Sequence, residues 1–284
     1  MNWTVWLIPH FHYDPVWWNT QSAYTQTWDE QAPDAGEARF AWPGHSAFSL
    51  VKAHLAKMRE DPQYSVVLAE VDYLKPYWDT YPEDRALIRR LIADGRLELV
   101  GGTYNEPNTN LTGIETTIRN AVHGVGFQRN VVGGVPSTAW QLDVFGHDPQ
   151  FAQVMSGAGL TSIAFARGPY HQWGPMLTSW NIREHRKPFA PVQFPTEFEW
   201  VSPGGDGLLT HYMAGHYSAG FSLDAAQDPQ TAAAELHELF TQLRPAAATH
   251  NVMIPMGSDF SPPMRWVTEL RAAWTERYPH VRLR

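Results

Sequence analysis

The sequence has 284 residues, 43% of them hydrophobic and 18% charged, which predicts one large globular domain and excludes a disordered chain. A formal net charge of -8 argues against nucleic acid or an anionic membrane as the main partner. Cysteine is absent, so disulfides, thiol catalysis and thiolate ligands are excluded, and any metal site must use His, Asp, Glu or carbonyl oxygen.

The first half of the chain predicts strands alternating with helices. It opens on an apolar stretch without the basic region of a secretory signal. No apolar run approaches the roughly 20 residues that cross a bilayer, so we expect a cytoplasmic protein. Ser46 suits a helix N-cap, and Thr112 with Glu115 matches a capping box. The predicted elements are strands at 3–9, 65–69 and 97–100 and helices over 46–60, 82–94 and 112–130.

The second half continues the alternation, with one hairpin. The turn sequence Ser-Pro-Gly-Gly-Asp-Gly at 202–207 predicts that two flanking strands pair as a hairpin. Asp148-Pro149 suits the start of a helix that runs to about 158. The remaining predicted elements are strands at 139–142, 162–166, 197–201, 208–213, 252–256 and 281–284 and helices over 232–243 and 264–276.

Alternating strands and helices predict an α/β fold, either a seven-stranded parallel sheet or an incomplete (β/α)7 barrel with helices outside. No domain boundary is evident, so residues 1–284 are expected to form one domain. The long polar and aromatic stretch 20–43 predicts a lid or insertion over a site. The 13 tryptophans could fill the core or stack on sugar rings, and composition alone leaves both open.

Polar residues follow the first predicted strand as His10-Phe-His12-Tyr-Asp14. Residues two apart share a face of a strand, and active sites of parallel α/β folds lie at the carboxyl ends of strands. Imidazole and carboxylate both bind Zn²⁺. The alternative is that a histidine packs in the core and Asp14 caps the turn before Pro15. The grouping of three polar residues favours a functional site.

Acids also follow two later strands. Asp143 ends a buried strand, where an unpaired carboxylate would be costly and a metal ion or an arginine would remove the cost. The alternative is that Asp143 and His147 cap the next helix. Asp259 follows the strand at 252–256, and Arg167 follows the strand at 162–166 and could orient a carboxylate. Two carboxylates across a pocket are what glycoside hydrolysis needs, so a metal-assisted hydrolase is predicted, with its substrate undetermined.

Three sequence blocks resemble glycoside hydrolase family 38, the α-mannosidases. They are H-x-H-x-D-P-x-W from His10 to Trp17, D-x-F-G-H from Asp143 to His147, and G-[SD]-D-F from Gly257 to Phe260. The resemblance covers essentially the whole chain and implies a retaining, zinc-dependent hydrolysis of α-mannosides. The roles it implies are zinc ligation by His12, Asp14 and Asp143, nucleophilic attack by Asp143, acid/base catalysis by Asp259, and substrate binding by Trp17, Arg167 and Tyr217.

The resemblance also sets expectations about geometry and completeness. A retaining mechanism requires the carboxyl groups of Asp143 and Asp259 to lie about 5–5.5 Å apart. Family members carry helical and β-domains after this one, and a fourth zinc ligand, a histidine, comes from that region. We therefore expect the 284-residue chain to be weakly active or inactive on its own, while the full-length protein hydrolyses an α-mannoside and could form a homo-oligomer.

Three other functions are compatible with the sequence. A metal-dependent polysaccharide deacetylase uses a related incomplete barrel, but its H-x-x-x-H motif is not found here. A non-catalytic carbohydrate-binding module would tolerate replacement of Asp143 without loss of metal or ligand. A family relative could act on a phosphorylated or glycerate-linked mannosyl compound, for which basic residues near the pocket would be needed. Ligand types alone leave cobalt or calcium open beside zinc.

Overall fold

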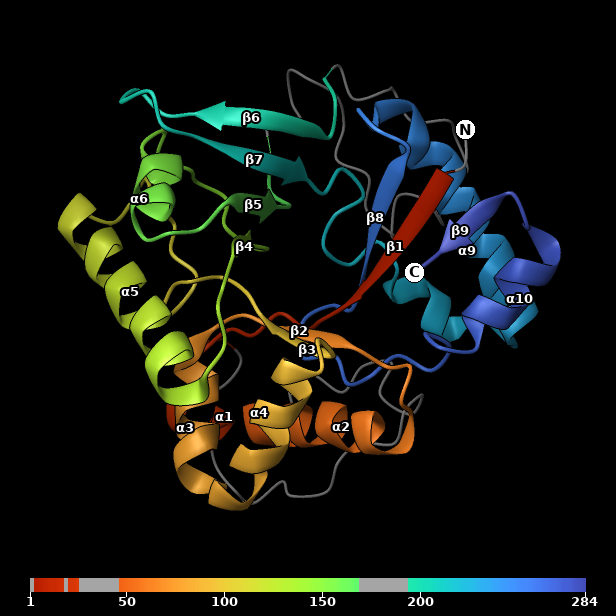
Figure 1. Cartoon of the computed structure of the whole chain (residues 1–284), viewed down its shortest axis with the longest axis horizontal. Coiled ribbons are helices and arrows are strands. Elements are labelled where there is room, and N and C mark those ends of the chain that lie inside the picture. Colours follow the sequence, from red (N-terminus) through yellow and green to blue (C-terminus); the bar gives the residue numbers. More distant parts are fainter. Residues whose placement is uncertain (1–2, 18–19, 26–45, 169–193) are drawn as a thin grey trace.

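The computed structural model describes residues 3–17, 20–25, 46–168 and 194–284. Within these ranges nine strands form three sheets, none of them closed, and the sheets lie on three sides of a common centre (Figure 1). One sheet has the order β8-β1-β9, the second pairs β2 with β3, and the third has the order β4-β5-β7-β6. The strands are β1 Trp3–Pro9, β2 Val66–Leu68, β3 Leu97–Leu99, β4 Thr138–Gln141, β5 Ser162–Phe165, β6 Glu197–Val201, β7 Gly207–Tyr212, β8 Asn251–Met256 and β9 Val281–Leu283.

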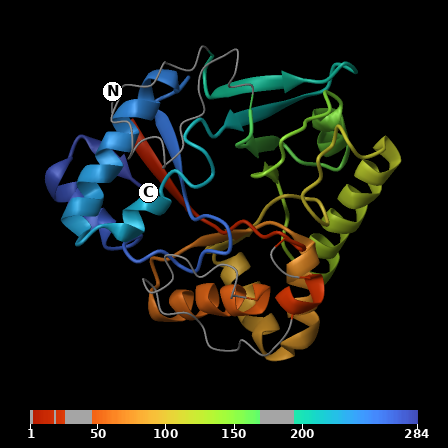
Figure 2. The ribbon, with the colours of Figure 1, turned by 180° about the vertical axis from the view of Figure 1, so that it is seen from behind.

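The helices lie outside the sheets in both views of the ribbon (Figures 1 and 2). The described α-helices are α1 Gln21–Tyr24, α2 Ala47–Glu60, α3 Val71–Thr80, α4 Arg85–Ala93, α5 Ile114–Phe127, α6 Phe151–Gly157, α9 Pro229–Leu243 and α10 Leu270–Arg277. Shorter 3₁₀ or π segments are Pro82–Asp84, Gln128–Val132, Phe221–Ala225 and Arg244–Ala246. No described helix is both long and apolar enough to cross a membrane.

The predicted α/β class is confirmed. Of its two predicted arrangements, one seven-stranded parallel sheet is wrong for the described residues, where nine strands form three open sheets. The alternative, an incomplete (β/α)7 barrel, stays a prediction. Strands β2 and β3 are three residues long and pair only with each other within that part of the chain. Strand β6 runs antiparallel to β7, as the hairpin turn predicted. Single backbone hydrogen bonds link neighbouring sheets instead, from Gly101 N to Thr138 O at 2.8 Å and from Gly220 N to Pro255 O at 2.9 Å.

Most element boundaries follow local sequence signals, with a few corrections. The Ser46 side chain accepts a hydrogen bond from Ser49 N, so the predicted N-cap of α2 is confirmed. The predicted capping box at Thr112 is wrong, because Gly113 is the N-cap of α5 and no side chain caps it. The last helix begins at Leu270 instead of 264. Helix α3 was not predicted, because Pro76 interrupts its pattern. Most of the predicted lid at 20–43 lies outside the described residues.

A partly buried carboxylate links the β6–β7 hairpin to the segment before β8. Glu197 lies 2.9 Å from His211 Nδ1 and accepts hydrogen bonds from Thr196 Oγ1 at 2.9 Å and from Ala248 N at 2.7 Å. Burial favours the neutral acid, but these partners outweigh it and lower the pKa of Glu197 below its ordinary 4.5. The ionised carboxylate therefore stabilises the folded chain.

This pair predicts a specific loss of stability in acid. Because the folded pKa of Glu197 is depressed, its stabilisation is fully present above about pH 4.5 and is lost as the pH falls through the lower folded value. We expect Glu197→Gln to lower the free energy of unfolding at pH 7 and to flatten its decline below pH 4.5. Urea unfolding at several pH values measures both effects. Glu199→Gln, at an exposed position of the same strand, is the control; an equal response of both variants would contradict the prediction.

Candidate functional site

One chemically active side chain follows each of seven strands. Because strands of the same direction end at the same edge, these groups converge from sequence positions far apart. They are His12 after β1, Glu70 after β2, Glu106 after β3, Asp143 after β4, Arg167 after β5, Tyr217 after β7 and Asp259 after β8.

Backbone pairing beyond β1 and β8 brings His12 next to Asp259. The two residues form an isolated parallel bridge, with His12 N donating to Ser258 O at 3.0 Å and Phe260 N donating to His12 O at 2.9 Å. His10 makes a different contact: its Nε2 lies 2.8 Å from Tyr217 O, and burial lowers the pKa of its ring to about 4. The neutral ring of His10 therefore supports the loop that carries Tyr217.

The buried ring of His12 lies between two carboxylates. Its Nε2 is 3.4 Å from Asp14 Oδ1, and its Nδ1 is 3.4 Å from Glu106 Oε2. Burial opposes a charge on the ring, but the closeness of Asp14 and the charges of Glu106 and Asp259 outweigh it and raise the pKa of His12 to about 10. The pocket around His12 therefore favours a positive charge, whether a proton or a cation.

The same surroundings fit a divalent metal ion. His12, Glu70 and Glu106 each offer a ligand atom within 4.8 Å of the others, so this group could hold a metal. Neither ring nitrogen of His12 makes a hydrogen bond within the described residues. Nitrogen and carboxylate oxygen are donors that Zn²⁺ accepts. The predicted ligand set of His12, Asp14 and Asp143, and zinc as its metal, stay predictions.

The two predicted catalytic acids have different partners. Arg167 Nε donates to Asp143 Oδ1 at 2.5 Å, and the Tyr217 hydroxyl donates to Asp259 Oδ1 at 2.8 Å. The guanidinium of Arg167 also lies over the Tyr217 ring, 5.9 Å from its centroid. Burial, the largest influence, raises the pKa of Asp259 above its ordinary 3.8 despite the opposing effects of His12 and Tyr217. The expected contact of Arg167 with the nucleophile candidate is therefore present.

Trp17 lies at the exposed rim of this group. Its side chain is 46% exposed, and its ring stacks near Phe260 with centroids 6.4 Å apart. This exposure contrasts with Trp274, which is fully buried in the core and donates to Val281 O at 2.7 Å. Trp274 therefore fills the core, whereas the exposed ring of Trp17 suits sugar stacking, which stays a prediction.

Sequence reasoning missed Glu70, Asp72 and Glu106. Glu70 and Asp72 are buried and make no side-chain hydrogen bond within the described residues, and the side chain of Glu106 is 8% exposed. Burial raises the pKa of Asp72 to about 7, and burial together with the neighbouring acids raises those of Glu70 and Glu106. Glu70 directly follows the strand predicted at 65–69, the same signal that identified Asp143 and Asp259. Glu106 lies further beyond the strand predicted at 97–100 and had no such signal.

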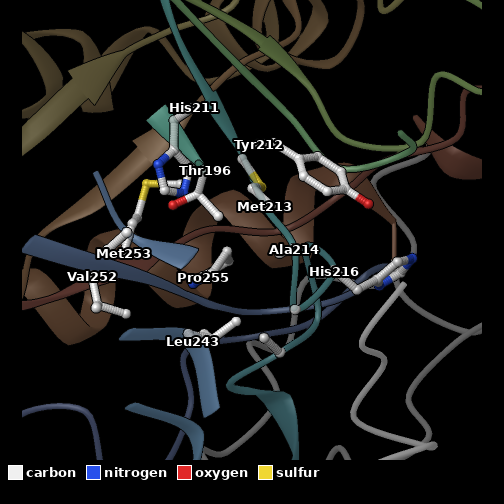
Figure 3. Close-up of a pocket in the computed structure, with 13 residues that line it drawn as sticks. Thr196, His211, Tyr212, Met213, Ala214, His216, Leu243, Val252, Met253 and Pro255 are labelled. Carbon is white, nitrogen blue, oxygen red and sulfur yellow. The ribbon is translucent and has the colours of Figure 1, made fainter. Parts of the chain in front are cut away.

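A small cavity lies between β7, β8 and the end of α9 (Figure 3), and none of the acids described above lines it. Residues that line it include His211, Met213, Leu243, Val252 and Pro255, and none of its lining residues is an Asp or Glu. Because it lacks a carboxylate, the cavity does not match the acid chemistry of the site. It is packing space beside the strand ends.

The chain belongs to the glycosyl hydrolases family 38, whose N-terminal domain model matches residues 2–284. It is 24% identical over 210 residues to Alpha-mannosidase 2x of Mus musculus, covering 74% of this chain and 16% of that protein. It is 25% identical over 268 residues to Alpha-mannosidase F of Dictyostelium discoideum, covering 90% of this chain and 24% of that protein. The chain thus spans about a quarter of these relatives' length or less.

A solved structure agrees at the level of the fold. An alpha-mannosidase from Enterococcus faecalis V583 superposes with a TM-score of 0.75 at 20% identity, covering 99% of this chain and 28% of that one. The arrangement of three open sheets is therefore a family 38 N-terminal-like fold.

Proposed function

We propose that this domain carries the catalytic acids of a retaining α-mannosidase. In this proposal Asp143 is the nucleophile that attacks the anomeric carbon, and Asp259 protonates the leaving oxygen and later activates water. Family membership and the similarity to alpha-mannosidases support the reaction class. The substrate is an α-D-mannoside, and a cytoplasmic location is part of the same proposal.

The observation that carries the proposal is the different pairing of the two acids. A nucleophile must be ionised and a general acid must be protonated, so their surroundings must differ. Asp143 faces the permanent positive charge of Arg167 at 2.5 Å. Asp259 accepts a hydrogen bond from the neutral hydroxyl of Tyr217, and burial raises its pKa although the charge of His12 opposes this. These environments match the two roles.

The remaining residues would bind the sugar and the metal. His12 and Asp14, with Asp143, would hold Zn²⁺, which when bound supplies Lewis-acid contacts to sugar hydroxyls. Trp17 offers an exposed ring for one face of the mannose. Tyr217 and Arg167 hold the two acids and could also donate to sugar hydroxyls. We keep the earlier expectation that the 284-residue chain alone is weakly active or inactive.

Azide rescue of Asp259→Ala tests the proposal in the longest native polypeptide that contains this chain. With an α-mannoside that has a good leaving group, formation of the glycosyl-enzyme intermediate needs little help from a general acid. Hydrolysis of that intermediate, however, lacks its general base in this variant. We expect turnover to fall about 10²–10⁴-fold and to recover with azide, giving α-mannosyl azide. Asp206→Ala, at an exposed turn position, is the control. Formation of β-mannose as the first product of the parent enzyme would show inversion and contradict the proposal.

A further inference from the structure

The segment that follows β3 lies along the segment that carries Asp143. Side chains of the first segment accept backbone N–H groups of the second, one after another. Glu106 Oε1 accepts from Leu142 N, and Glu106 Oε2 accepts from Asp143 N at 3.3 Å. Further along, Asn108 Oδ1 accepts from Phe145 N at 3.1 Å, and Thr109 Oγ1 accepts from Asp148 N at 2.8 Å. Residues 106–109 therefore act as a template for the backbone of 142–148.

Gly146 lies beside this template. A Cβ atom at Gly146 would lie 1.9 Å from Oδ1 of Asn110, whose exposed side chain is free to rotate away. The hydrogen bonds to Glu106, Asn108 and Thr109, and not this glycine, therefore hold the backbone around Asp143.

Glu106 also reaches across to β1. The same Oε2 that accepts from Asp143 N lies 3.4 Å from His12 Nδ1, while His12 Nε2 faces Asp14. The two groups form a close ion pair without a hydrogen bond in this structure. A carboxylate beside one ring nitrogen of a histidine favours the proton on that nitrogen and leaves the other nitrogen for a metal. Glu106 is 8% exposed at its side chain, so water competes little for these contacts.

We propose that Glu106 is a positioning residue that orients His12 Nε2 towards the metal and fixes the backbone of Asp143. One carboxylate thereby aligns groups that come from β1 and from β4. Glu106 itself acts through these two residues and does not contact the sugar. The metal-related part of this proposal rests on the proposed function, whereas the part about the Asp143 backbone does not.

Amide hydrogen exchange in the metal-free chain tests the backbone part. In Glu106→Gln an NH₂ group replaces one carboxylate oxygen. In one orientation of the amide this donor faces the N–H of Leu142, and in the other it faces the N–H of Asp143 and the ring of His12. Either way a donor faces a donor. We expect exchange at the Leu142 and Asp143 amides to rise tenfold or more. Asn108→Ala should instead raise exchange at Phe145. The matched control is Glu98→Gln on the exposed face of β3. Unchanged exchange at Leu142 and Asp143 in a folded Glu106→Gln chain would overturn the proposal.

Metal binding tests the second part with readouts independent of activity. We expect Glu106→Gln to weaken zinc binding about 10- to 100-fold in competition with a chromophoric chelator, and Glu98→Gln to leave it unchanged. In ¹¹³Cd-loaded, ¹⁵N-labelled protein, the metal coupling should lie on Nε2 of His12. Coupling on Nδ1 would place the metal on the side of the His12 ring that faces Glu106. Glu70 and Glu106 would then be metal ligands, and the positioning role would be overturned. If Glu106→Gln does not fold, Glu106→Asp, which withdraws the oxygens by one methylene, replaces it with the same expected results.

Discussion

Replacing Asp143 with asparagine is expected to reduce hydrolysis of an aryl α-mannoside on the order of 10⁴-fold or more, as for loss of a nucleophile elsewhere. Asparagine keeps the shape of aspartate and an oxygen that can accept from Arg167 Nε, so the fold should survive. It lacks the charge that attacks the anomeric carbon. The measurement is kcat/KM in the native full-length enzyme, with thermal unfolding to verify that the variant is folded.

Metal content measured beside activity separates two roles of the same residue. We expect about one zinc per parent chain, and clearly less in Asp143→Ala, because a predicted ligand is lost. Asp79→Ala removes an exposed acid of α3 and is the control. If Asp143→Ala retains zinc but loses activity, Asp143 acts as the nucleophile and is not a zinc ligand. Activity retained in Asp143→Asn would refute the mechanism.

Absence of metal from the parent would have a definite meaning. If zinc is supplied and still does not bind, either ligands outside residues 1–284 are indispensable or the predicted ligand set is wrong. A longer polypeptide that binds zinc would support the first explanation. Failure of the longer polypeptide as well would remove the metal from the mechanism.

The strand ends were the part of the site that sequence could predict. His12, Asp143 and Asp259 each follow an apolar stretch directly, and a charged residue at such a place has few structural reasons to be there. Their convergence follows from parallel strand direction alone. The pairings within the site required three dimensions, since the partners of Asp143 and Asp259, Arg167 and Tyr217, are set by strand order.

Glu106 shows what the sequence could not reveal. Its role depends on two contacts, one to the backbone of Leu142 and Asp143 and one to the ring of His12. Backbone donors have no sequence signature, so an acceptor for them is invisible in a residue pattern. Glu70, by contrast, directly follows a predicted strand. What the sequence hid there is helix α3, which begins at the next residue and contains Pro76, a residue that argues against a helix.

The division into three sheets was also beyond reach of the sequence. Alternation of strand and helix predicts the class of fold, but it does not say which neighbouring strands form hydrogen-bonded ladders. Strands β2 and β3 have three residues each, and Gly101, just after β3, donates its amide to Thr138 O of β4. The positive φ of Gly101, 88°, turns the chain at that contact.

Gly257→Ala is expected to destabilise the fold and the site together. Gly257 follows β8 directly, and a Cβ atom there would lie 1.9 Å from the carbonyl oxygen of His10, which follows β1. That oxygen belongs to backbone held by the pairing of Pro9 with Met256, so it cannot move aside as a flexible side chain would. Alanine must therefore push β1 and β8 apart, at a cost of about 1–3 kcal/mol or more in the free energy of unfolding.

The same displacement should reach the proposed general acid, Asp259, and the proposed metal ligand, His12, because their backbones are paired just beyond the clash. We expect Gly257→Ala to weaken zinc binding as well as to lower the midpoint of urea unfolding. Gly126→Ala is the matched control: it lies within α5, where a new Cβ would meet nothing within 4 Å, and it should stabilise the chain by up to about 1 kcal/mol. Equal stability of the two variants would contradict the prediction, because it would mean that β1 and β8 accommodate the added Cβ at no cost in the free energy of unfolding. The bridge between His12 and Asp259 would then not depend on the close packing of Gly257 against His10.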